Sequence, residues 1–276
     1  MAPATGNSAR PSAAGWRLLL QFGLYTVLIC LFLSIAIMPW LTLSWWKVFR
    51  RCASIAAALS LWLVIRRSEG RSIGSYGFAN RRAGKSQLAL GLVVGVGTLA
   101  LLLAVGLLVG ACRIQVTPNT GRLWNTVIGF VPAALLIGVL EELVFRGMIL
   151  QNLLKSSTPF AVIASSVLYA VVHVRTTVFG ADIVFELIGL FLLGSVLALS
   201  YLATGQLYLA VGLHASLAYG ARVNKLFLEF PRAMPTWVVG TNRIVNGLVA
   251  WLVLGAIAGL MVWWMRRSRT GGMQNG

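Results

Sequence analysis

Acidic and histidine side chains are scarce in this sequence. Its 276 residues include six Asp or Glu and two His, against 23 Lys or Arg. Charged residues make up 11% of the chain, whereas soluble domains contain roughly 25%. The low charge and a hydrophobic content of 58% exclude an ordinary soluble domain and indicate an integral membrane protein.

Cysteine is also scarce, and its pattern argues against two kinds of site. The three residues, Cys30, Cys52 and Cys112, are odd in number and form no CxxC pair. Neither a disulfide framework nor a cysteine-ligated zinc site is supported by this spacing. We therefore predict that the cysteines are small apolar packing residues.

The net charge of +17 does not indicate nucleic-acid binding, because the basic residues are spread over many loops and both ends of the chain. Such a distribution fits contact with anionic lipid headgroups at the membrane surface. Membrane lipid is thus an expected partner, and nucleic acid is not.

The apolar segments predict an all-α fold, a polytopic membrane bundle of about eight transmembrane helices, since one crossing takes roughly 20 residues. We place the helices at residues 18–40, 52–65, 88–111, 125–154, 160–178, 183–203, 207–221 and 244–265. The bundle covers residues 17–267 and is followed by a C-terminal tail, 268–276. Residues 1–16 are rich in Ala, Pro, Ser and Gly, which predicts a disordered N-terminal tail.

One of these helices contains two adjacent carboxylates, Glu141 and Glu142, followed by Arg146. A carboxylate at membrane depth is costly and is usually functional. Glu142 and Arg146 are four residues apart with the acid first, the better order for a helical ion pair. Glu141 points about 100° away and lacks that partner. A desolvated carboxylate binds protons more tightly, so we predict Glu141 as a general base and Glu142 as the structural partner of Arg146.

Both histidines also lie in apolar segments. Glu141 lies 16 residues before Ser157, the centre of a predicted helical hairpin, and His173 lies 16 residues after it. Because antiparallel helices rise equally, the two side chains should lie at the same depth. His214 lies about nine residues after the short turn before a later helix, and its depth matches if the two hairpin helices project beyond the hydrocarbon by about five residues, roughly 8 Å. We therefore predict that Glu141, His173 and His214 converge from three helices on one cavity.

Three motifs in this region carry a family resemblance. They are EExxxR at Glu141–Arg146, an aromatic residue four positions before His at Tyr169–His173, and a His motif at His214–Ala218. Over about residues 70–222 the chain resembles the CAAX protease and bacteriocin-processing (Abi) family of intramembrane proteases, CAAX prenyl protease 2-like hydrolases.

The resemblance implies an endopeptidase that cleaves a membrane-associated protein or peptide. Glu141 and His173 would activate a water molecule, and His214 would stabilise the oxyanion. Tyr169 stands where Phe is usual, and Ala218 stands where many members have Asn. The loss of an oxyanion donor can slow a reaction about 10²–10³-fold. Turnover should therefore be low unless Tyr219, Asn224 or a backbone N–H replaces that donor.

Two alternatives remain open at this point. One Glu and two His also match a catalytic zinc set, although the chain has no HExxH motif. We favour a metal-free glutamate mechanism without a cofactor, and zinc is the alternative. A non-catalytic scaffold or immunity protein is the second alternative, favoured by Ala218.

The distribution of basic residues predicts a topology that can be tested. With the N-terminus inside, the cytoplasmic side gains the basic 66–85 loop and the Arg-rich C-terminus, so we place a multi-pass protein in the cell membrane with both termini cytoplasmic. Reporter fusions after Gly276 and within residues 113–123 should then report opposite sides. Signals from the same side would contradict the topology.

Overall fold

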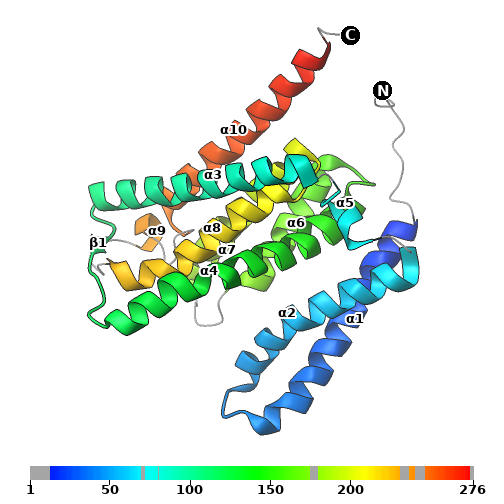
Figure 1. Ribbon diagram of the computed structural model, residues 1–276, viewed down its shortest axis with the longest axis horizontal. Helices are drawn as coiled ribbons and strands as arrows, with labels where there is room; N and C mark the ends of the chain where they lie inside the picture. Colours follow the sequence, from blue (N-terminus) through cyan, green and yellow to red (C-terminus); the bar gives the residue numbers. More distant parts are fainter. Residues whose placement is uncertain are drawn as a thin grey trace. The chain divides into compact units, whose positions relative to one another are not determined.

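The chain is almost entirely helical in the computed structural model, which describes residues 13–69, 72–79, 81–174, 180–230, 236–239 and 246–273 (Figure 1). Within these ranges, each of the eight predicted segments contains a helix. The long helices are α1 (Ala13–Ile37), α2 (Trp45–Val64), α3 (Arg81–Leu108), α4 (Thr120–Glu142), α6 (Thr158–His173), α7 (Ala181–Thr204), α8 (Tyr208–Phe227) and α10 (Leu248–Met273).

Short elements join these helices. They are η1 (Met38–Trp40), η2 (Ile65–Glu69), η3 (Ile73–Tyr76), η4 (Leu143–Leu150), α5 (Gln151–Leu153), α9 (Thr236–Val239), β1 (Arg113–Ile114) and β2 (Leu228–Glu229). The two strands pair antiparallel.

Six helical stretches of the described chain are long and apolar enough to cross a membrane. They are Gly15–Trp40, Trp45–Arg67, Arg82–Leu108, Thr120–Leu153, Asp182–Thr204 and Leu248–Arg267. Helix α6, with 16 residues, is apolar but shorter, and α8 is not among the six. The prediction of an all-α polytopic membrane protein is confirmed, whereas a count of eight crossings stays a prediction.

Several predicted helix ends differ from the structure. Helices α3 and α4 begin earlier than predicted, at Arg81 rather than residue 88 and at Thr120 rather than residue 125, and α8 ends later, at Phe227 rather than residue 221. Helix α1 begins at Ala13, so the last four residues of the predicted 1–16 tail are helical. Helix α2 begins at Trp45 rather than residue 52, because Lys and Arg side chains can extend from a helix end toward water and do not stop the helix. Helix α10 continues to Met273, into the predicted 268–276 tail. Residues 1–12, 175–179 and 274–276, on which parts of these predictions fall, lie outside the described residues.

The predicted helix 125–154 changes its winding partway. It is α-helical to Glu142, π-helical over Leu143–Leu150 and α-helical again over Gln151–Leu153. Every residue of the π-helical turn is buried. π-Helical insertions are rare overall, but many of those that occur lie at functional sites. This one directly follows the two glutamates.

The chain divides into two compact units, a division that the predicted single bundle of residues 17–267 does not include. Unit 1 comprises the described residues of Met1–Tyr76 and Leu143–Ala161, and unit 2 those of Gly77–Glu142 and Val162–Gly276. In unit 1, α1 and α2 pack around Cys30, Cys52 and their neighbours. All three cysteines of the chain are buried and free, so their predicted role as packing residues is confirmed.

Helix α8 is the centre of unit 2. It packs against α3 and α4, which lie on either side of it in Figure 1. Residues 209–217 of α8, which include His214, are all buried, so this part of the helix packs inside the unit. Helix α7 packs mainly against α10.

Candidate active site

Three helices of unit 2 supply the candidate site. Glu141 and Glu142 are the last residues of α4, Tyr169 and His173 lie in the second half of α6, and His214 lies in the second turn of α8. Glu141 falls inside the Thr120–Leu153 stretch that is long enough to span a membrane. The polar groups thus meet within an apolar region.

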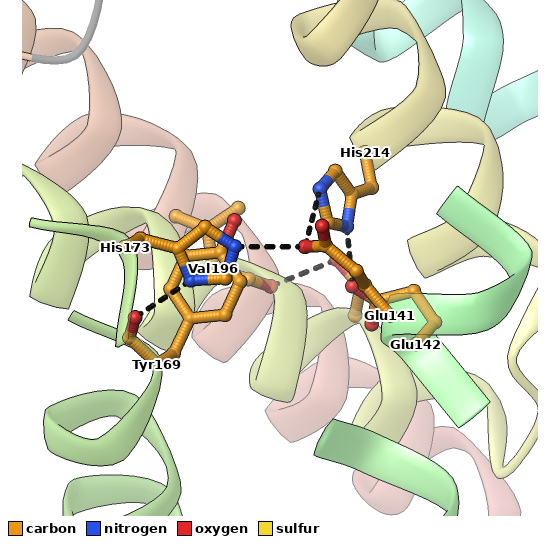
Figure 2. Close-up of polar contacts among 7 residues, drawn as sticks. Glu141, Glu142, Tyr169, His173, Val196 and His214 are labelled. Carbon is orange, nitrogen blue, oxygen red and sulfur yellow. Dashed lines mark hydrogen bonds and ion pairs between the residues drawn. The ribbon is translucent and has the colours of Figure 1, made fainter. Parts of the chain in front are cut away.

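The Glu141 carboxylate is the point on which both histidines converge (Figure 2). Its Oε2 atom lies 3.0 Å from His173 Nε2 and 3.4 Å from His214 Nε2. The structure therefore brings together the three side chains that helix spacing predicted to meet. Their catalytic roles remain predictions at this stage.

The hydrogen bonds of His173 determine how its protons are arranged. Its Nδ1 lies 2.8 Å from the carbonyl oxygen of Tyr169, which can only accept, so Nδ1–H is the donor. Its Nε2 faces Glu141 Oε2 at hydrogen-bond distance. Since a carboxylate and a bare imidazole nitrogen both accept, one proton must be shared between them. Glu141 and His173 therefore form a proton-sharing pair.

His214 lies between the two carboxylates. Its Nδ1 lies 2.7 Å from Glu142 Oε1, while its Nε2 faces Glu141. This contact of Glu142 was missed by sequence reasoning, which assigned Glu142 to Arg146. Neighbouring residues on a helix point about 100° apart, so sequence reasoning did not place both glutamates on one imidazole. In the structure, both glutamates reach His214.

Arg146 belongs to unit 1, and its predicted pairing with Glu142 stays a prediction. The side chain is 1% exposed, and its guanidinium carbon lies 5.7 Å from the centre of the Phe145 ring. A cation this deeply buried requires compensation, which is consistent with a structural role.

Tyr169 contacts both histidines through its ring. The ring stacks on His173 with centroids 4.1 Å apart and meets His214 edge-on at 6.1 Å. At 2% exposure it leaves the imidazoles little freedom to rotate. Tyr169 is thus a positioning residue for His173, through its ring and its carbonyl oxygen.

Exposure separates the site into two pairs. The side chains of Glu141 and His173 are 28% and 25% exposed, whereas those of Glu142 and His214 are 0% and 6% exposed. A substrate or water can therefore approach Glu141 and His173, while Glu142 supports His214 from the buried side.

Tyr219 and Asn224, the two side chains that could replace the oxyanion donor missing at Ala218, lie away from His214. Tyr219 donates its hydroxyl to the carbonyl oxygen of Val127 at 2.9 Å. Val127 precedes Glu141 by 14 residues, roughly 21 Å along the helix. Asn224 follows His214 by ten residues, roughly 15 Å along α8. Neither side chain is placed to assist His214.

The donor set shares one feature with a metal centre. Both imidazoles present Nε2 to one carboxylate oxygen, and both hold Nδ1 against an acceptor, as metal-binding histidines do. Among the residues that the structure describes, however, no group of three or more His, Cys, Asp or Glu side chains is arranged to hold a metal ion. Glu141 and His173 instead approach each other at hydrogen-bond distance.

One known family matches the part of the chain that contains this site. Residues 122–219 match the family described as type II CAAX prenyl endopeptidase Rce1-like. The resemblance predicted from the motifs is confirmed. The matched segment contains both glutamates, Tyr169 and both histidines. No curated protein matches the chain. The family match supports an intramembrane endopeptidase of the CAAX-protease type, in a lipid environment and with a peptide substrate.

The buried Glu142–His214 contact leads to a stability prediction. Glu142→Gln keeps the side-chain shape but removes the charge that accepts the His214 proton, so we expect a loss of about 1.5–3 kcal/mol in unfolding free energy. Glu229→Gln, at an exposed glutamate of β2, is the matched control and should change stability by less than about 0.5 kcal/mol. Thermal unfolding in detergent measures both. Equal stability of the two variants would contradict a structural contribution from the contact.

Proposed function

We propose that the protein is an intramembrane endopeptidase that hydrolyses a peptide bond of a membrane-associated protein or peptide with a water molecule activated by Glu141 and His173. The observation that carries the proposal is the convergence of both histidines on Oε2 of Glu141, at 3.0 and 3.4 Å. The Rce1-like match over the same helices supports the reaction class.

The Glu141–His173 pair supplies the base. When the shared proton resides on His173, Glu141 is an ionised carboxylate that can take a proton from water. The water oxygen then bonds to the peptide carbonyl carbon, and the carbonyl electrons move onto oxygen to give a tetrahedral oxyanion. The proton held by Glu141 next passes to the leaving nitrogen as the carbon–nitrogen bond breaks. General acid–base transfer of this kind contributes about 10²–10⁴-fold to a rate.

His214 stabilises the oxyanion, and its contact with Glu142 explains how. Nδ1–H of His214 donates to Glu142 Oε1, so the ring can donate to the oxyanion only through Nε2. That nitrogen must then carry a second proton. The doubly protonated ring is stabilised by the buried Glu142 carboxylate at 2.7 Å. Glu142 is thus a positioning and charge-balancing residue in this proposal, in addition to its predicted contact with Arg146.

A cleavage assay tests the mechanism. Purified protein in lipid vesicles is offered a membrane-anchored peptide library, and Glu141→Gln should lower cleavage by about 10²–10⁴-fold, since an amide cannot take the proton. Glu229→Gln serves as the control and should cleave like the wild type. Cleavage that survives Glu141→Gln would end the glutamate mechanism.

A chelator arm of the same assay separates the zinc alternative. Under the proposed mechanism, cleavage continues in the presence of a chelator. Loss of cleavage on chelation with recovery on adding zinc would assign the site to a metal enzyme. If the wild type cleaves nothing in the library while remaining folded, the non-catalytic alternative is favoured.

Ala218 provides a gain-of-function test. Residue 218 lies one turn after His214 on α8, so an amide there can join His214 at the oxyanion. Ala218→Asn should cleave at least as fast as the wild type, with an increase of up to about 10²–10³-fold. Initial rates on the same peptides measure it. A slower, well-folded variant would show that this position does not face the reacting carbonyl.

A further inference from the structure

Helices α4 and α8 approach each other closely at Gly138, one turn before Glu142. A methyl group on Gly138 would lie 3.0 Å from the carbonyl oxygen of Val211 and 3.3 Å from both Cβ and N of Ala215. Ala215 is the neighbour of His214. Gly138 and Glu142 are four residues apart and share one face of α4. The backbone approach and the Glu142–His214 contact therefore lie on adjacent turns of the same helix interface.

Helix α8 cannot retreat from α4, because α3 closes its other side. A methyl group on Gly91 of α3 would lie 2.3 Å from the carbonyl oxygen of Leu209, and one on Gly212 of α8 would lie 2.4 Å from the carbonyl oxygen of Leu88. Both distances are to backbone atoms, which do not move aside as a flexible side chain does. The turn that precedes His214 is thus in direct backbone contact with α3.

From these contacts we infer that Gly138 is a positioning residue of the active site, which sets the separation of Glu142 and His214. A side chain at position 138 would push α4 and α8 apart at the turn next to the 2.7 Å bond between Glu142 Oε1 and His214 Nδ1. Since α3 blocks α8 from moving away, α4 must tilt or shift, and the bond lengthens. The consequence for catalysis rests on the proposed function, but the consequence for His214 does not.

The chain offers a direct reporter, because it contains two histidines. In purified protein with ¹⁵N-labelled histidine, the Nδ1–H signal of His214 reports its bond to the Glu142 carboxylate, and His214→Gln assigns that signal. Gly138→Ala should shift the His214 signal away from its wild-type position. Gly129→Ala is the matched control, since Gly129 lies in the same helix and a methyl group there meets nothing within 4 Å. It should leave the signal unchanged.

A swap variant tests the contact itself. Gly138→Ala combined with Ala215→Gly removes the Ala215 methyl group, one of the three close neighbours, while the Val211 carbonyl oxygen and the Ala215 nitrogen stay in place. Its His214 signal should therefore lie closer to wild type than that of Gly138→Ala, without full recovery. Three results would each overturn the inference. They are a wild-type His214 signal in Gly138→Ala, an equal shift in Gly129→Ala, and a swap variant whose signal is no closer to wild type than that of Gly138→Ala. Failure of both Gly138 variants to fold would also overturn it, because the effect would then not be local to His214.

Cleavage measured on the same proteins extends the test to function. Gly138→Ala should cleave more slowly, by up to about 10-fold, because its neighbours must move by a few tenths of an ångström and a full misplacement of about 1 Å can cost roughly 10²-fold. The swap variant should recover part of that loss. A shifted His214 signal with wild-type cleavage would show that the Glu142–His214 distance does not limit the reaction, and would overturn the catalytic part of the inference. Absence of cleavage in the wild type would count against the proposed function, while the His214 signal would still decide the role of Gly138.

Discussion

A buried carboxylate must be paired, and the 2.7 Å contact between Glu142 and His214 supplies such a pairing in unit 2. Charges removed from water are costly unless a partner compensates them, and loss of one partner leaves the other uncompensated. The contact requires α4 and α8 to approach closely at a defined register. Gly138, with Ala215 opposite it, leaves room for that approach, and α3 packs closely on α8.

The second pair, Glu141 and His173, has a different environment. Its side chains are about one-quarter exposed, and a proton is shared between them at 3.0 Å. The carbonyl oxygen and ring of Tyr169 hold His173 in place, so the accessible pair is as well oriented as the buried one. In the proposed mechanism, the buried pair balances charge at the oxyanion and the accessible pair moves a proton.

The π-helical turn at Leu143–Leu150 is the least expected part of the fold. It begins at the residue after Glu142, and its complete burial includes Arg146. Apolar periodicity could not distinguish it from α-helix, because α- and π-helices both place residues four apart on roughly one face. The boundary between the two compact units falls at the same point of the chain. Sequence patterns alone give no sign of that boundary, since no linker marks it and the predicted helix 125–154 continues across it.

The sequence by itself was sufficient to predict the all-α membrane architecture, the approximate positions of eight helical segments and the convergence of Glu141, His173 and His214, because apolar runs and scarce ionisable groups are visible without coordinates. Equal helical rise was sufficient to predict that Glu141 and His173 meet. Only the tertiary structure decided which atoms pair. It placed Glu142 on His214, directed Tyr219 to Val127, and brought backbones into contact at Gly138, Gly91 and Gly212. These outcomes depend on how helices rotate and cross, and rotation is set by packing between segments distant in sequence, which a linear pattern does not encode.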